Sequence, residues 1–155
     1  MTAGTIEVSG RAGGPVAVPA GALDDLAARV DGRLLRAGDP GWEEAIGIWN
    51  GMAASTPALV LQPGSAAEVA AGVGFARDHG LLLGVKGGGH HIAGTAIADG
   101  GLLLDLSGMR TVTVDPEARL AQVGPGCRSP TSTGPPRPTA WPPRSASSPR
   151  SGWAA

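Results

Sequence analysis

Cysteine is almost absent from this chain of 155 residues, and its scarcity narrows the possible folds. The single cysteine, Cys127, excludes an internal disulfide framework and a cysteine-rich metal site. No apolar run approaches the length of a membrane span, and the N-terminus has no basic segment followed by an apolar stretch. We therefore expect a cytoplasmic protein with no membrane contact and no export signal.

An excess of charge of one sign is also lacking, because 12 basic residues nearly balance 13 acidic ones and leave a net charge of -1. This balance argues against nucleic acid as the main partner. The charges are unevenly spread, however: residues 128–155 hold four arginines, seven prolines and six serines, but no acid. The change in composition predicts a boundary near residue 127 and a disordered tail over 127–155.

What the sequence does contain is a glycine-rich loop with two histidines, directly after an apolar stretch typical of a buried strand. The consecutive glycines Gly87, Gly88 and Gly89 carry no Cβ, so the backbone can turn several N–H groups toward one anion. Lys86 would add a positive charge at the mouth of this cradle, and Thr95 a hydroxyl hydrogen bond. The spacing fits neither G-x-G-x-x-G nor a P-loop, so a nucleotide would be bound in another way. The alternative is a flexible surface turn with two solvated histidines.

The hydrophobic pattern predicts an α+β domain with mixed strand order over residues 20–126, after a loose N-terminal lead-in at 1–19. Ser65 and Glu68 stand three residues apart before a helical stretch, which is the spacing of a capping box. The expected helices span 22–35, 40–49 and 66–77. The expected strands span 58–61, 81–85 and 101–106, with a hairpin of 111–115 and 119–123.

The order of seven segments carries a further signal. These segments are 49–51, 57–60, 75–80, 86–96, 104–110, 114–116 and 123–126. In this order they resemble the FAD-binding domain of the vanillyl-alcohol oxidase and p-cresol methylhydroxylase (PCMH) superfamily, and within it the berberine-bridge-enzyme-like FAD-linked oxidases. The resemblance covers roughly residues 39–126 and is more specific than any single segment.

The resemblance implies the first subdomain of a PCMH-type FAD-binding domain, with a small mixed sheet flanked by helices. Its loop would bind the FAD pyrophosphate through backbone amides. His90 takes the position of the histidine that many members join covalently to the methyl carbon of the isoalloxazine ring, with a noncovalent contact as the alternative, and His91 has a lesser role. No metal is implied. The expected cofactor-binding residues are Lys86, Gly87, Gly88, Gly89, His90, His91, Gly94 and Thr95.

Two departures from the family pattern remain. Members continue for several hundred residues, including the substrate domain that supplies the catalytic base, so no catalytic residue is assigned here. The codons of residues 128–146, read one frame over, permit a string that closely resembles the family sequence after Gly126. We therefore hypothesise a frameshift after about Gly126, with a genuine low-complexity tail as the alternative.

Two functions follow from the resemblance. One is an FAD-dependent oxidoreductase, in which a small-molecule substrate gives a hydride to the flavin. The other is a truncated, non-catalytic fragment with weak or no FAD binding. The substrate, the electron acceptor and the oligomeric state are not predicted from this sequence.

Overall fold

The computed structural model describes residues 4–128. The predicted disordered tail therefore falls almost entirely on residues 129–155, which lie outside the described residues, and the hypothesis of a frameshift is not tested. The described elements are β1 (Thr5–Ser9), β2 (Pro15–Pro19), α1 (Ala20–Ala27), β3 (Arg33–Leu35), α2 (Trp42–Ile46), β4 (Leu59–Gln62), α3 (Ala66–Asp78), β5 (Leu83–Lys86), β6 (Leu102–Asp105), the 3-10 helix η1 (Leu106–Gly108), β7 (Val112–Asp115) and β8 (Leu120–Val123).

A four-stranded mixed sheet forms the centre of the fold, in the order β3-β4-β6-β5. Strand β3 runs antiparallel to β4, whereas β4, β6 and β5 are parallel to one another. Helix α3 connects β4 to β5, so the last strand of this unit, β6, enters the sheet between them. The α+β class and the mixed strand order predicted from the sequence are confirmed.

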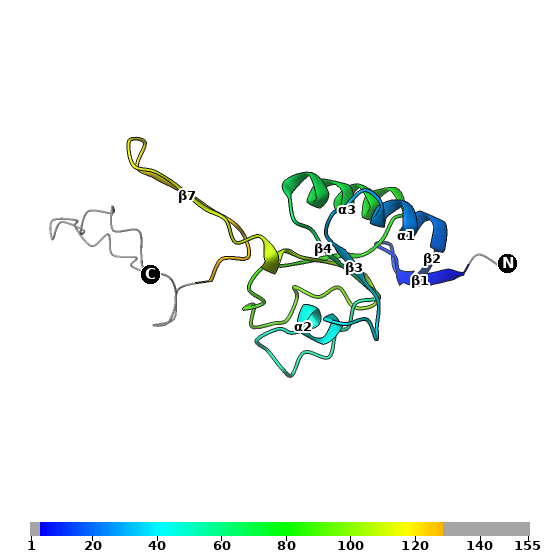
Figure 1. Ribbon diagram of the computed structural model, residues 1–155. Coiled ribbons are helices and arrows are strands. Elements are labelled where there is room, and N and C mark those ends of the chain that lie inside the picture. The colour runs from blue at the N-terminus through cyan, green and yellow to red at the C-terminus, as the bar shows by residue number, and fades with distance from the viewer. Residues whose placement is uncertain (1–3, 129–155) are drawn as a thin grey trace.

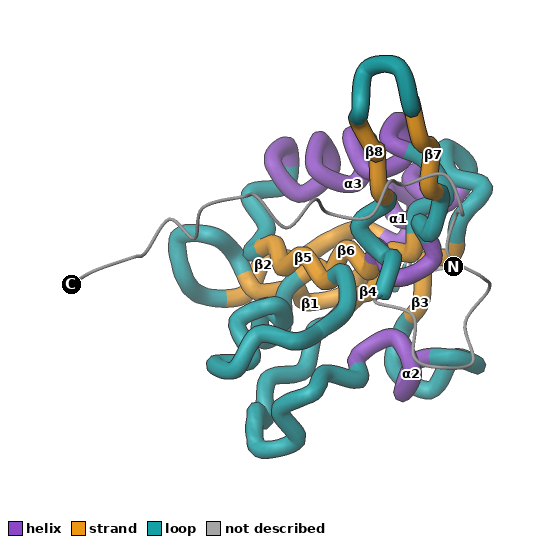
Figure 2. Tube along the Cα trace, turned by 90° about the vertical axis from the view of Figure 1, so that its left-hand side faces the viewer, coloured by secondary structure: helices purple, strands orange, loops and turns teal. Residues whose placement is uncertain are grey.

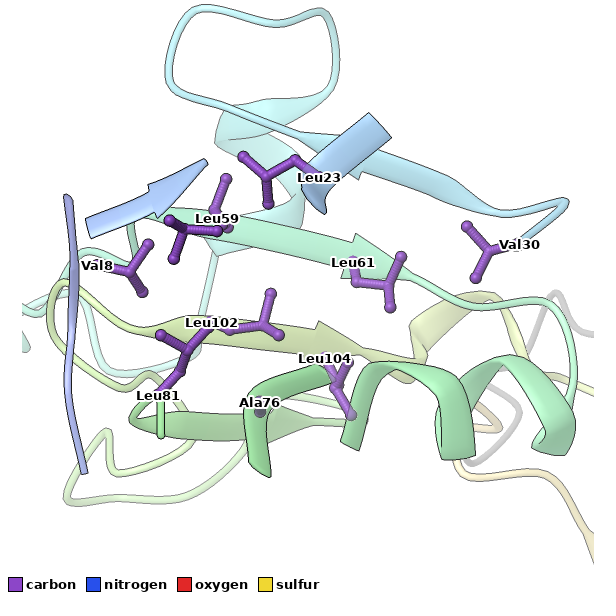
Figure 3. Packing of buried hydrophobic residues seen from close by; sticks show 10 residues of the cluster. Val8, Leu23, Val30, Leu59, Leu61, Ala76, Leu81, Leu102 and Leu104 are labelled. Atoms are coloured by element: carbon purple, nitrogen blue, oxygen red, sulfur yellow. The ribbon is translucent and has the colours of Figure 1, made fainter. Parts of the chain in front are cut away.

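Both faces of this sheet are covered, which explains why its strands are apolar without alternation. Leu59, Leu61, Leu102 and Leu104 point to the side of α1 and α3 and are fully buried there with neighbours such as Leu23 (Figure 3). The intervening residues of β4 and β6 pack on the opposite face against α2 and the 97–98 region. Figure 1 shows α1 and α3 on one side of the sheet and α2 on the other.

The first 19 residues differ from the expected loose lead-in, because they contain the antiparallel hairpin of β1 and β2. Its inward positions, Val8 and Val18, are buried in the main core. The turn passes through Gly13 and Gly14, both at positive φ. The missed signal is the alternation of apolar residues on either side of this glycine pair, a pattern typical of a hairpin.

The first two predicted helices are shorter than expected. The helical spacing over 22–35 continues through residues that instead form β3, because Leu34 and Leu35 pair with Leu61 and Val60 of β4. Long-range pairing here overrides a local periodicity that favours helix. The second helix, expected over 40–49, is limited to the five residues of α2.

The predicted C-terminal hairpin is confirmed as β7 and β8, which pair antiparallel as a separate two-stranded sheet. Almost all of its residues are exposed, among them Val112, Leu120 and Val123. Figures 1 and 2 show this hairpin standing away from the central sheet. Because a two-stranded ribbon buries little surface, the main core lies elsewhere, in the 5–105 region.

Candidate functional site

The three parallel strands of the central sheet end at one common edge, and the predicted loop lies there. β4 ends before the turn Pro63-Gly64-Ser65, β5 before the glycine loop, and β6 before η1. In open α/β sheets ligands bind outside the carboxyl ends of the strands. The fold therefore brings the loop to the edge where a cofactor site is expected.

Several N–H groups of the glycine loop have no hydrogen-bond partner in the part of the chain that the structure describes. None of the backbone N–H groups of Gly88, Gly89 and His90 donates a hydrogen bond within residues 4–128. The Gly89 carbonyl, in contrast, accepts from the Trp49 N–H at 2.9 Å, so the carbonyl side of the loop is held against the protein. Such a row of free donors is suited to an anion.

A second segment, 47–53, forms the floor of the loop. The Asn50 side-chain amide donates to the Ile92 carbonyl at 2.7 Å. Gly94 has a φ of +68° and lies so close to the floor that a Cβ added there would be 2.5 Å from the Ala53 Cβ. The floor and the loop are thus in contact along most of the loop, and a larger residue than glycine does not fit at position 94.

The other side of the loop base lies against the segment after β8. A Cβ added to Gly87 would lie 2.6 Å from the Pro125 carbonyl oxygen. The contact places the segment 124–126 beside the start of the loop. In the sequence this segment is only part of the family pattern, and its contact with the loop was not predicted.

Lys86 does not lie at the mouth of the loop as expected. Its side chain is buried, with the residue 4% exposed, and its ammonium group donates to the Ala45 carbonyl and, at 3.4 Å, to the Gly47 carbonyl. Its Nζ also lies 3.4 Å from Oδ1 of the buried Asp105. The expectation that Lys86 offers a charge to a ligand at the mouth is therefore wrong for this structure, because its charge is used inside the fold.

The two histidines of the loop are both exposed. The His90 ring folds back over the loop, since a Cβ on Gly88 would be 2.6 Å from its Cδ2. His91 Nδ1 lies 3.1 Å from the Thr95 Oγ1, within hydrogen-bond distance. The structure thus brings His90 to the free N–H groups and pairs His91 with Thr95, while both imidazoles stay accessible.

The turn at the start of α3 is closed by a carboxylate of the chain itself. The predicted capping box is confirmed: Ser65 Oγ accepts from the Glu68 N–H at 3.3 Å, and the hydroxyl donates to the Glu68 carboxylate at 2.9 Å. That carboxylate also accepts from the N–H groups of Gly64 and Gly32. The hydrogen bonds from Gly64 and Ser65 hold the pKa of Glu68 below its ordinary value.

Asp105 and Gln62 belong to the hydrogen-bond network around Lys86 and were not predicted from the sequence. Asp105 accepts from the Gln62 amide at 2.9 Å and from the Ser107 N–H at 3.2 Å. The available signal was an acidic residue within a run of leucines, since a buried carboxylate needs a partner. The identity of that partner, Lys86, comes from the strand register that places β5 beside β6.

Residues 4–128 contain no cluster of three or more histidine, cysteine or acidic residues arranged to hold a metal ion. Within the same range, no helix has both the length and the apolar character needed to cross a membrane. The cytoplasmic location expected from the sequence stays a prediction.

Comparison with known proteins shows which proteins this chain is similar to. Residues 57–131 match the FAD binding domain family. The chain is 35% identical over 97 residues to (R)-6-hydroxynicotine oxidase of Paenarthrobacter nicotinovorans, covering 63% of this chain and 21% of that protein. It is also 34% identical over 89 residues to xylooligosaccharide oxidase of Thermothelomyces thermophilus, covering 56% of this chain and 18% of that protein.

The chain is also similar to solved structures. The crystal structure of 6-hydroxy-D-nicotine oxidase from Arthrobacter nicotinovorans superposes with a TM-score of 0.58 at 35% identity, over 61% of this chain and 21% of that one. The BBE-like 1 protein of Physcomitrella patens superposes with a TM-score of 0.62 at 26% identity, over 68% and 23%. The chain therefore spans about a fifth of the length of these relatives.

The matched segment is thus similar to part of an FAD binding domain, and FAD is the cofactor that this similarity supports, since FAD-linked oxidoreductases are among the relatives. The resemblance found in the sequence is confirmed: residues 57–131 match the FAD binding domain family, and the chain is similar to (R)-6-hydroxynicotine oxidase and to a BBE-like protein.

Proposed function

We propose that this chain is the cofactor-binding part of an FAD-linked oxidoreductase, and that its glycine loop binds the FAD pyrophosphate through backbone N–H groups. The observation that carries the proposal is the set of N–H groups at Gly88, Gly89 and His90 that have no acceptor among the described residues 4–128, on a loop held by the floor segment 47–53. Backbone donors of this kind bind phosphate groups without a cationic side chain.

The chemistry of the loop fits an anionic dinucleotide. A side chain at Gly87 would collide with the Pro125 carbonyl and one at Gly94 with Ala53, so the loop keeps its close backbone path. The residues that would hold FAD are Gly87, Gly88, Gly89 and His90, with His91, Gly94 and Thr95 lining the site. When bound, FAD accepts a hydride from a substrate and passes the electrons to an acceptor.

We further propose that His90 is the point of covalent attachment to the flavin: the new C–N bond would replace a C–H bond of the flavin methyl group and the imidazole N–H bond, and the two electrons and two protons released would pass through the flavin to dissolved oxygen. Support comes from its position directly after the glycines, which the family resemblance makes the attachment position, and from its exposed imidazole beside the free N–H groups. An alkylated imidazole withdraws electrons from the flavin and prevents its loss. His91, whose Nδ1 faces Thr95, would instead contribute to the lining of the loop.

The residues assigned here bind and orient the cofactor. The names of the relatives mention nicotine derivatives and oligosaccharides, so small organic molecules are the proposed class of substrate for the complete enzyme. The alternative, a non-catalytic fragment with weak or no FAD binding, is an outcome of the test below.

The test is an absorbance spectrum of the purified chain after incubation with FAD and acid precipitation. Flavin bands that stay with the protein pellet are expected for the wild type and for His91→Ala, and should be lost from the pellet of His90→Ala. Flavin released from the wild type into the supernatant would mean noncovalent binding and would disprove attachment at His90. A colourless wild-type protein would contradict FAD binding and favour the non-catalytic fragment.

A further inference from the structure

The only lysine of the chain lies beneath the glycine loop, where a ligand cannot reach it. We propose that Lys86 is a positioning residue: together with Asp105 it fixes the loop to its floor, and it leaves the phosphate charge of the ligand to the backbone N–H groups. This inference rests on the proposed function, because it assigns to Lys86 a part in shaping the FAD site.

The ammonium group of Lys86 faces acceptor groups of the chain itself. An ammonium group carries three N–H bonds. In this structure its Nζ contacts three acceptors: the Ala45 carbonyl, the Gly47 carbonyl at 3.4 Å and Asp105 Oδ1 at 3.4 Å. Two of the N–H bonds thus point to carbonyl groups of the chain, and the Asp105 carboxylate balances the charge, so the ammonium group is held inside the fold.

Asp105 is equally committed to the protein. Besides Lys86 it accepts from the Gln62 amide and from the Ser107 N–H. Its side chain is 1% exposed, and no buried polar side-chain atom within residues 4–128 lacks a hydrogen-bond partner. The pair is therefore a closed, neutral group that contributes no net charge to the site above it.

The position of Lys86 in the chain explains why this pair would control the loop. It is the last residue of β5 and directly precedes Gly87, so its backbone is the start of the loop. The two carbonyls that it binds come from the end of α2 and the start of the floor segment 47–53. Two residues further along that segment, the Trp49 N–H binds the Gly89 carbonyl. The Lys86 side chain thus connects the start of the loop to the start of the floor segment 47–53.

The first experiment uses the single lysine as a probe. The full chain is treated briefly with acetic anhydride, and acetylation of Lys86 is measured by mass spectrometry of the peptide that contains it. We expect acetylation at least about tenfold slower in the native chain than in urea, since the amine reacts only when the region opens. We also expect the native rate to be slow already without FAD, and bound FAD can only slow it further because it stabilises the closed state.

Two results would overturn the placement. Acetylation of the native chain at nearly the rate seen in urea would show that the amine is exposed. Acetylation that is fast without FAD and slow with FAD would show that Lys86 faces the ligand. Neither result depends on a substitution, and the comparison of native chain with urea needs no bound FAD.

The second experiment removes both charges together, because removing one would leave the other buried and unpaired. In the double variant Lys86→Met with Asp105→Asn, we expect the Kd for the initial noncovalent binding of FAD to rise about tenfold or more, which corresponds to about 1.4 kcal/mol of binding energy. Hydrogen exchange should become faster at the bonded N–H groups of the loop and its floor, those of Gly94 and Trp49, and stay unchanged in the α3 peptide. The matched control removes the exposed pair Arg77 and Asp78, 2.9 Å apart, as Arg77→Met with Asp78→Asn, and should change neither quantity.

An unchanged Kd and unchanged exchange of the loop in the folded double variant would disprove the positioning role. If its circular dichroism shows that the double variant does not fold, Lys86→Arg replaces it: this variant keeps the charge but alters the contacts to Ala45 and Gly47, and a smaller rise in Kd is expected. If the wild-type chain itself does not bind FAD, the proposed function fails, while acetylation and loop exchange still decide where Lys86 lies and what it fixes.

Discussion

Two turns lie at the same edge of the central sheet and differ in whether their backbone N–H groups have hydrogen-bond partners among residues 4–128. At the turn between β4 and α3, the Gly64 N–H donates to the Glu68 carboxylate, which also accepts from the Ser65 hydroxyl. At the loop after β5, the N–H groups of Gly88 and Gly89 have no partner within residues 4–128. The first turn carries its own anion, and the second is left open for one.

The comparison teaches where an anionic ligand would go. The N-terminus of a helix such as α3 is in general a favourable place for a phosphate. Here that place is taken by Glu68, so a dinucleotide would find donors at the glycine loop instead. The difference between the two turns depends on their hydrogen-bond partners, so substitutions in either turn can test it.

The largest effect is expected from Gly94→Ala, which adds a methyl group where the open loop touches its floor. The backbone at φ +68° costs a residue with a Cβ about 1–2 kcal/mol. The added Cβ would also lie 2.5 Å from the Ala53 Cβ, an overlap that forces the loop to move. We expect a lower urea midpoint and a Kd for FAD raised about tenfold or more.

The matched control for this substitution is Gly64→Ala in the closed turn. Gly64 does not have a positive φ, and an added Cβ would meet only the Glu68 Oε1 at 3.5 Å, an ordinary contact. Its urea midpoint and its Kd for FAD should match those of the wild type. Equal losses for the two variants would remove the distinction between the turns.

A smaller effect is expected from Glu68→Gln, which removes the charge from the closed turn. The pKa of Glu68 is lowered in the folded state, first by the Gly64 N–H and then by Ser65. The stabilisation that this gives is present above the ordinary glutamate pKa of about 4.3 and is lost as the pH falls through the lower folded-state pKa. Urea unfolding between neutral and acidic pH should show the variant less stable at pH 7 and the difference shrinking below about pH 4.

The control is Glu117→Gln in the exposed turn of the β7 and β8 hairpin, which should differ little from the wild type at any pH. A Glu68→Gln variant whose difference from the wild type does not change with pH would mean that the charge of Glu68 does not stabilise the turn. In that case the helix terminus would be open to an external anion, and the contrast between the two turns would be lost.

The parts of this fold that the sequence predicted are those decided by neighbouring residues. The capping box of Ser65 and Glu68, the apolar strands β4, β5 and β6, and the C-terminal hairpin each depend on residues a few positions apart. The glycine loop was found for the same reason, because its composition is unusual over a short stretch. Its place at the edge of the sheet follows from the strand that precedes it.

The parts that sequence reasoning missed are decided by distant residues. Strand β3 has helical spacing and becomes a strand only through pairing with β4. Lys86 looks like a ligand-binding charge next to the glycines, but its acceptors are 41 residues away at Ala45 and on β6 at Asp105. No pattern within the loop indicates that these groups meet beneath it.

The smallest effect is expected from Thr95→Val on the open side of the loop. The contact between the Thr95 Oγ1 and the His91 Nδ1, 3.1 Å apart, is exposed, so its loss should change the free energy of unfolding by about 0.5 kcal/mol or less. FAD affinity should fall only slightly, because the free N–H groups of Gly88 and Gly89 are untouched. The urea midpoint and a fluorescence titration with FAD measure both quantities. A large loss of affinity at unchanged stability would mean that the Thr95 hydroxyl or the orientation of His91 contributes directly to binding. In that case side chains of the loop, and not only its backbone N–H groups, would bind FAD.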